Sequence, residues 1–98
     1  MAKSVEKSLG DTQVLILLAL RRNDSWLATG EIRAAVGRAT GIWHSYQNLH
    51  GTIRKLWARK LVVGKRIRGK IRYKILEPGR QGVAATLRFY QEQIAPLL

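Results

Sequence analysis

The stretch Ser45–Leu76 reads SYQNLHGTIRKLWARKLVVGKRIRGKIRYKIL, and the spacing of its apolar residues changes halfway along. In its first half the apolar side chains recur at helical spacing, at Leu49, Ile53, Leu56 and Trp57. This pattern predicts a helix over about 45–59 that begins at Ser45. In the second half apolar and cationic residues alternate, which is typical of strands. The stretch therefore predicts a helix followed by a β-hairpin over 61–76.

Two details of this stretch carry expectations of their own. Lys60 continues the apolar stripe of the helix, so we expect its aliphatic stem to lie along the core while its ammonium group reaches solvent. At the tip of the hairpin, a three-residue loop would pair Ile67 with Ile71 and place both on one face, and we favour that register. A two-residue Arg68-Gly69 turn, which pairs Ile67 with Lys70, is the alternative.

Outward from this stretch, the chain reads as further helices and one short apolar piece. Periodicity predicts a helix from Thr12 to about Arg22, a possible short strand at 26–28, and a helix from about Thr29 that ends within 37–41. Glu77-Pro78-Gly79 is a typical helix start, and that helix should run to about Ala95. We predict an α+β, mostly helical fold in which the second and third helices form a helix-turn-helix and the hairpin is a wing. Three helices form the core, and a C-terminal helix follows the wing.

Length and composition limit the classes of protein that this chain can belong to. Its 98 residues, 46% of them hydrophobic, suit a single globular domain, which we place at 11–98 after a loose arm over 1–10. The chain has no cysteine, so disulfides and thiolate metal sites are excluded. The longest apolar run, Val14–Leu20, is far too short to span a bilayer, and no signal peptide is evident near the N-terminus. The expected location is cytoplasmic, at the nucleoid, with no membrane partner.

The distribution of charge is the most informative property of the sequence. The net charge is +12, from 18 Lys and Arg against 6 Asp and Glu. No acidic residue lies between positions 32 and 76, although this stretch carries twelve of the positive charges. A field of one sign raises self-repulsion, and it suits a polyanionic partner. The alternative is a merely soluble basic surface, but mixed charges would serve solubility equally well.

The helix over 45–59 has a small, polar face opposite its apolar stripe, and the hairpin after it is densely cationic. Amide side chains can pair with adenine edges and guanidinium groups with guanine or phosphate, which suits insertion into the major groove of duplex DNA. The wing cations suit phosphates or the minor groove, whereas protection of a strand edge would explain only one or two of them. The predicted DNA-binding residues are His44, Ser45, Gln47, Asn48, Gly51, Arg54, Lys55, Arg59, Lys65, Arg66, Arg68, Lys70 and Arg72.

The chain resembles winged-helix regulators of the PadR and MarR type in two stretches. The first is Ser45–Val63, which contains the expected recognition helix, and the second is Tyr73-Lys74-Ile75-Leu76-Glu77-Pro78-Gly79-Arg80. The resemblance covers roughly residues 10–95. It implies a DNA-binding transcriptional regulator, often dimeric through the terminal helix. Three positions depart from the family pattern: Glu77 replaces a threonine, Lys60 stands where a glycine is frequent before the wing, and His50 stands where PadR proteins have a tyrosine.

The last helix carries apolar residues at alternating spacings of four and three, which is a heptad-like seam. Its residues are Val83, Leu87, Tyr90, Ile94 and Leu97. We expect this seam to pair with a second copy in a twofold dimer, although it could instead pack against its own domain. Among the tryptophans, Trp26 and Trp57 are expected in the core and Trp43 on the surface.

Catalytic and metal-binding functions have no support in the sequence. His44 and His50 lie on different helix faces, and Glu31 has no partner at a spacing that suits acid–base chemistry. We therefore expect no enzyme activity, no metal, no cofactor and no evident small-molecule effector. Two alternatives to a sequence-specific regulator remain open: a non-specific architectural DNA binder, and a winged-helix RNA binder of the ribosomal type.

Overall fold

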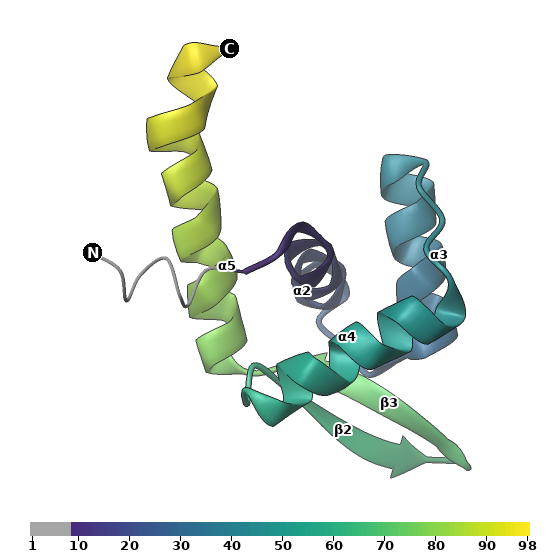
Figure 1. Ribbon diagram of the computed structural model, residues 1–98. Helices are drawn as coiled ribbons and strands as arrows, with labels where there is room; N and C mark the ends of the chain where they lie inside the picture. Colours follow the sequence, from purple (N-terminus) through teal and green to yellow (C-terminus); the bar gives the residue numbers. More distant parts are fainter. Residues whose placement is uncertain (1–8) are drawn as a thin grey trace.

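The computed structural model describes residues 9–98, which form four helices and a small antiparallel sheet (Figure 1). The elements are α2 (Asp11–Asn23), β1 (Leu27–Ala28), α3 (Thr29–Thr40), α4 (Tyr46–Ala58), β2 (Val62–Ile67), β3 (Lys70–Ile75) and α5 (Glu77–Phe89). A π-helical turn, η1 (Tyr90–Ile94), and a 3₁₀ turn, η2 (Ala95–Leu97), extend the last helix. The predicted order of elements, including the short strand, is confirmed. The expected arm lies, apart from Leu9 and Gly10, outside the described residues.

The starts of α3, α4 and α5 each have a local cause in the sequence. The Ser45 hydroxyl accepts a hydrogen bond from Asn48 N at 3.1 Å, which caps α4 as its predicted start requires. At the start of α3, Glu31 Oε1 accepts a hydrogen bond from Ala28 N at 2.8 Å. Pro78 lies in the first turn of α5, where its missing N–H costs nothing. The starts of α3 and α4 fix where the two helices of the helix-turn-helix begin.

The core lies where α2, α3, α4 and the sheet meet. Twelve apolar side chains are buried there: Ile16, Leu17, Leu20, Ile32, Val36, Leu49, Ile53, Leu56, Val62, Tyr73, Ile75 and Val83. Because Leu49, Ile53 and Leu56 are fully buried, one side of α4 is fixed against the core and its opposite side faces solvent. The predicted apolar stripe of this helix is thus confirmed for these three residues.

The sheet has the strand order β1-β3-β2, and its register corrects the expected turn. Ile67 pairs with Lys70, so the connection is the two-residue Arg68-Gly69 turn and not the three-residue loop that we favoured. Both turn residues have positive φ, 52° and 82°, which is the geometry of the tight hairpin turn that matches strand twist. The tip extends beyond the core, so nothing requires the two isoleucines to share a face; Ile71 is 38% exposed.

Two further expectations near the end of α4 are wrong. Trp57 is 38% exposed, because it packs over Gly64 of the wing and edge-on against Tyr73 instead of entering the core. Lys60 lies beyond the helix, exposed and in the left-handed region at φ 63°, so it does not continue the stripe. Trp26, expected in the core, is half-buried on the sheet with the Lys65 ammonium 5.8 Å from its ring centre. Trp43 is 52% exposed, as predicted.

The later turns of the last helix stand away from the rest of the molecule (Figure 1). Its first turns pack on α2, and Val83 is fully buried in the core. Val83 is therefore unavailable to a partner, which corrects its place in the predicted dimer seam. Farther along, Phe89, Tyr90 and Leu97 are large apolar side chains that remain exposed. Within residues 9–98 no helix is both long and apolar enough to cross a membrane.

Candidate nucleic-acid interface

The exposed face of α4 brings together most of the predicted contact residues on that helix. Gln47, Asn48, Gly51, Arg54 and Lys55 are all exposed, on the side of the helix opposite the buried stripe. Apart from the adjoining residues and the helix's own backbone, no atom of residues 9–98 comes within 4 Å of the position that a Cβ of Gly51 would occupy, so the backbone there is open to close approach. A helix face of this kind, narrow at its glycine and cationic in its second half, fits a groove about 12 Å wide.

The residues at the two ends of α4 are engaged within the protein. Ser45 serves as the helix cap, and His44 is half-buried, with its backbone oxygen accepting a 2.6 Å hydrogen bond from Arg33 Nε. The buried His44 Nδ1 has no hydrogen-bond partner among residues 9–98. At the other end, Arg59 Nη1 lies 3.5 Å from Gln13 Oε1 on α2. These predicted contact residues therefore hold α4 in place as much as they present groups to solvent.

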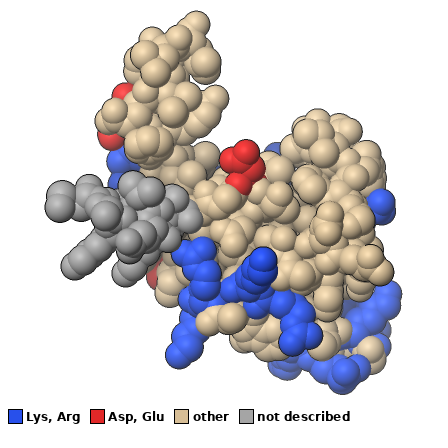
Figure 2. Space-filling model, in the orientation of Figure 1, with Lys and Arg blue, Asp and Glu red and all other residues tan. Residues whose placement is uncertain are grey.

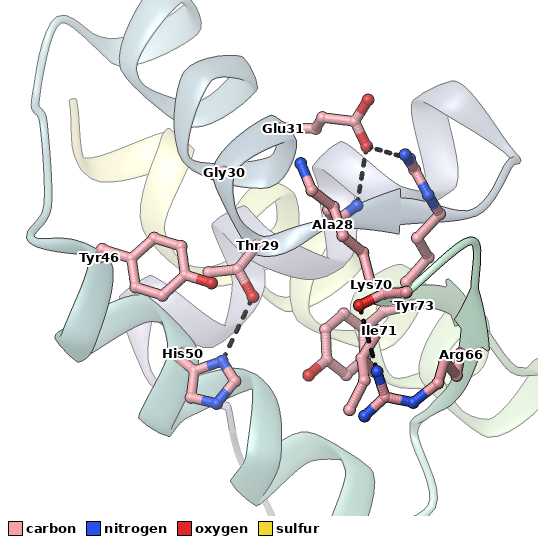
Figure 3. A pocket seen from close by; sticks show the side chains of 12 residues that line it. Ala28, Thr29, Gly30, Glu31, Tyr46, His50, Arg66, Lys70, Ile71 and Tyr73 are labelled. Atoms are coloured by element: carbon pink, nitrogen blue, oxygen red, sulfur yellow. Dashed lines mark hydrogen bonds and ion pairs between the residues drawn. The ribbon is translucent and has the colours of Figure 1, made fainter.

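A cleft of about 550 Å³ lies between the start of α3, the first turns of α4 and the wing (Figure 3). Its lining is Ala28, Thr29, Gly30, Glu31, Tyr46, His50, Arg66, Gly69, Lys70, Ile71, Arg72 and Tyr73. Three of the cations that line it, Arg66, Lys70 and Arg72, are among the predicted contact residues. The cleft thus joins the wing and the recognition helix into one continuous surface.

Sequence reasoning missed the aromatic wall of this cleft. The rings of Tyr46 and His50 stack with their centres 5.9 Å apart, and His50 Nδ1 lies 3.3 Å from Thr29 Oγ1. The four-residue spacing of Tyr46 and His50 was the available signal, because it places both on the side of the helix next to the wing. Behind them, burial raises the pKa of Tyr73, and the nearby Arg54 offsets only part of that rise.

The wing cations do not all point the same way. The register places Lys65, Lys70, Arg72 and Lys74 on one face of the hairpin and Arg66 on the other. Arg72 Nη1 forms a 2.7 Å ion pair with Glu31, so part of its charge is neutralised within the protein. Arg66 Nη1 donates to Gly69 O at 3.1 Å across the turn. Lys65, Arg66, Arg68 and Lys70 are exposed, whereas Arg72 and Lys74 are half-buried.

Charge separates the two halves of the molecule. Lys and Arg gather over α4 and the wing, whereas few charges lie on the far half of the last helix (Figure 2). Among the described residues no cluster of three or more His, Cys, Asp or Glu side chains could hold a metal ion. The surface is therefore organised around cations, amides and an exposed helix.

No protein-family model matches the chain, and no curated protein sequence matches it significantly. Solved structures do match. BpsR of Bordetella bronchiseptica, whose DNA binding is regulated by 6-hydroxynicotinic acid, is 27% identical with a TM-score of 0.67; the alignment covers 88% of this chain but only 58% of BpsR. F93 from STIV, a winged-helix DNA-binding protein, is 19% identical with a TM-score of 0.79 over 91% of this chain and 97% of its own.

A third match is the antimony-specific transcriptional repressor AntR, which is 25% identical with a TM-score of 0.65 over 85% of this chain and 69% of AntR. BpsR and F93 bind DNA, and AntR is a transcriptional repressor. The winged helix-turn-helix fold that the sequence predicts is confirmed by these likenesses. Its assignment to the PadR or MarR type stays a prediction.

Proposed function

We propose that this protein binds duplex DNA as a small dimeric transcriptional regulator, with α4 in the major groove and the wing along the flanking backbone. The observation that carries the proposal is the exposed face of α4, which combines amides, an open glycine and two cations, Arg54 and Lys55, with no acid. Gln47 and Asn48 supply the paired donors and acceptors that can read base edges. The likeness to winged-helix DNA-binding proteins supports this assignment.

The cleft between α3, α4 and the wing receives the phosphates beside the groove in this proposal. Arg66 and Lys70 supply cations, and the Tyr46 ring supplies an edge of the wall. At Gly30, in the first turn of α3, no atom of residues 9–98 outside that turn lies within 4 Å of a Cβ position, so a phosphate can approach the positive end of that helix. Phosphate contacts of this kind fix the register of the protein on DNA but do not read sequence.

The far half of the last helix is the proposed dimerisation surface. Leu87, Tyr90, Ile94 and Leu97 remain from the predicted seam, and Phe89 adds a further exposed ring. A twofold pair would present two copies of α4 to half-sites about 34–36 Å apart, one turn of the DNA helix. Leu97 is 82% exposed, so Leu97→Asp should not disturb the monomer, and sedimentation should shift toward a single 11.1 kDa species. Ile42→Asp, also exposed but remote from this helix, should leave the dimer intact.

In-vitro selection of bound DNA, repeated at two salt concentrations, tests sequence-specific binding. Enrichment of a motif with two half-sites supports the proposal, and a pool without enrichment contradicts it. Competition by a large excess of random duplex should remove little of the binding to the selected site. Preference for folded RNA over both duplexes would contradict a DNA-binding function altogether.

A second candidate function is a non-specific architectural DNA binder acting at the nucleoid. The net charge of +12 favours it, because phosphate contacts supply nearly all non-specific affinity. Such a protein would lose most of its binding to random duplex in the same competition experiment. The exposed amides of α4 favour the sequence-reading function over this one.

A further inference from the structure

A second hollow of about 470 Å³ lies between α2 and α3, in a part of the fold separate from the recognition helix and the wing. Its lining comes from the later turns of both helices: Leu15, Leu18, Ala19, Arg21, Arg22, Asn23, Ala35, Val36, Ala39 and Thr40. The volume falls within the range of small-molecule sites, about 300–1,000 Å³. None of these residues belongs to the proposed DNA-contacting surface, so the groove has no role in the function described above.

The floor of the groove is aliphatic. Leu15 and Leu18 of α2 face Ala35, Val36 and Ala39 of α3, and all but Val36 keep some exposure to solvent. Among the residues that the structure describes, no aromatic ring and no acidic side chain lines it. An aliphatic trough between two helices suits a flexible hydrocarbon chain better than a planar ring, which would gain from stacking on aromatic side chains.

The charges at the groove are both positive. Arg21 and Arg22 lie in the last turn of α2 and are exposed, and neither guanidinium group makes an ion pair or hydrogen bond with another described residue. The other polar donors are engaged with their own helices: Asn23 Nδ2 donates to Ala19 O at 2.7 Å, and Thr40 Oγ1 donates to Val36 O at 2.8 Å. Two guanidinium groups beside an apolar trough are complementary to one carboxylate at the end of a hydrocarbon chain.

We propose that this groove binds an aliphatic carboxylate of medium chain length. The carboxylate lies between Arg21 and Arg22, and the chain covers Leu15, Leu18 and the facing alanines. Burial of the chain supplies most of the affinity, and the arginines select for the acid.

The position of the groove also gives the ligand a route to the recognition helix. The wall formed by α3 is tied to α4 by the Arg33–His44 hydrogen bond and by the Thr29–His50 contact. A ligand that wedges α3 away from α2 therefore displaces α4 relative to the wing. If the proposed DNA-binding function holds, on which this second step rests, occupancy lowers DNA affinity, and DNA lowers ligand affinity by the same factor.

The first experiment measures binding of octanoate to the full chain by calorimetry and by NMR, without DNA. Octanoate should bind saturably, and octanamide, which has the same chain but no charge, should bind at least about fivefold more weakly. The double variant Arg21→Gln/Arg22→Gln should remove this preference. The matched control, Arg38→Gln/Arg88→Gln, also removes two exposed arginines from last helical turns, but neither of these lines the groove, so it should leave the preference unchanged.

A second pair of variants tests the place of binding. Ala39→Leu fills the groove and should abolish saturable binding, whereas Ala85→Leu, exposed on α5, should not. Equal binding of octanoate and octanamide, or octanoate binding that survives Ala39→Leu, would overturn the proposal. If Ala39→Leu instead dissociates the dimer, a second copy occupies the groove and the ligand proposal is wrong.

A separate experiment tests the effect of octanoate on DNA binding. With a selected duplex, octanoate should weaken wild-type binding by about fivefold or more and leave the Arg21→Gln/Arg22→Gln variant unaffected. Octanoate that binds without changing DNA affinity would refute the regulatory step alone. A protein that binds octanoate but no DNA would refute the proposed function and leave the ligand site standing.

Discussion

Replacing Lys60 by glycine is expected to stabilise the fold by about 0.5–1 kcal/mol. Lys60 has a φ of 63°, and the left-handed conformation costs an L-residue about 1–2 kcal/mol. Glycine avoids that cost, but its greater conformational freedom in the unfolded chain destabilises the fold by about 0.5–1 kcal/mol. The side chain is exposed, and the Lys60 N–H that donates to Trp57 O at 2.9 Å is retained by glycine. For a domain of this size the net gain corresponds to about 2–8 °C in Tm.

Thermal and urea unfolding followed by circular dichroism measure this change, and two further substitutions separate its causes. Lys60→Asn should give a smaller gain, because asparagine tolerates the left-handed region better than lysine does. Lys60→Gln removes the charge but keeps the backbone cost, so it should leave Tm unchanged. If Lys60→Gln stabilises as much as Lys60→Gly, relief of charge repulsion explains the effect and the argument from φ is refuted.

Three other predictions test the contacts behind the interface and the interface itself. Gly37→Ala would place a Cβ 2.4 Å from Trp43 Cδ2, so the indole must move. We expect the free energy of unfolding to fall by about 1–3 kcal/mol and tryptophan emission to shift to the red. Unchanged emission would contradict this prediction. Burial raises the pKa of Tyr73 above its usual 10.0, so the tyrosine ionises at lower pH in the unfolded chain than in the folded protein. The contribution of Tyr73 to the free energy of unfolding is therefore fully present below pH 10 and falls as the pH rises toward the pKa of the folded protein. Tyr73→Phe should remove that fall in urea titrations from pH 9 upward, and parallel profiles for the two proteins would argue against it. Arg54→Gln/Lys55→Gln should reduce the slope of log affinity against log salt by about 1.8, while the Arg38→Gln/Arg88→Gln control leaves it unchanged; equal slopes would exclude phosphate contacts by this pair.

The elements of this fold could be predicted from the sequence because local signals decide them. The apolar spacing through Leu49, Ile53 and Leu56 and the cap at Ser45 define α4 without any tertiary information. The exposure of Gln47 and Arg54 follows from the same spacing, since side chains opposite a buried stripe must face solvent. The helical half of the candidate site was therefore predictable.

The parts that could not be predicted depend on where each element ends relative to the core. Trp57 continues the apolar stripe, but the wing crosses α4 at this point. The indole therefore packs against Gly64 at the surface and does not enter the core. Val83 fits a heptad seam, yet α2 covers the first turns of α5. The cleft beside Tyr46 and His50 forms only when the wing, some twenty residues later in the chain, folds back against α3 and α4. No local pattern encodes these distances.

Two tryptophans, one at each end of α4, pack against glycines of neighbouring elements. A Cβ on Gly37 would overlap Trp43, just before the helix, and a Cβ on Gly64 would lie 2.7 Å from Trp57, in its last turn. The placement of the helix is thus set by contacts that its solvent-facing residues do not share. Positions such as Gln47, Asn48 and Arg54 can change during evolution without moving the helix that carries them. Descendants of one such chain could acquire new binding preferences while inheriting the same scaffold, and variation would be tolerated on the exposed face and purged at the two glycines.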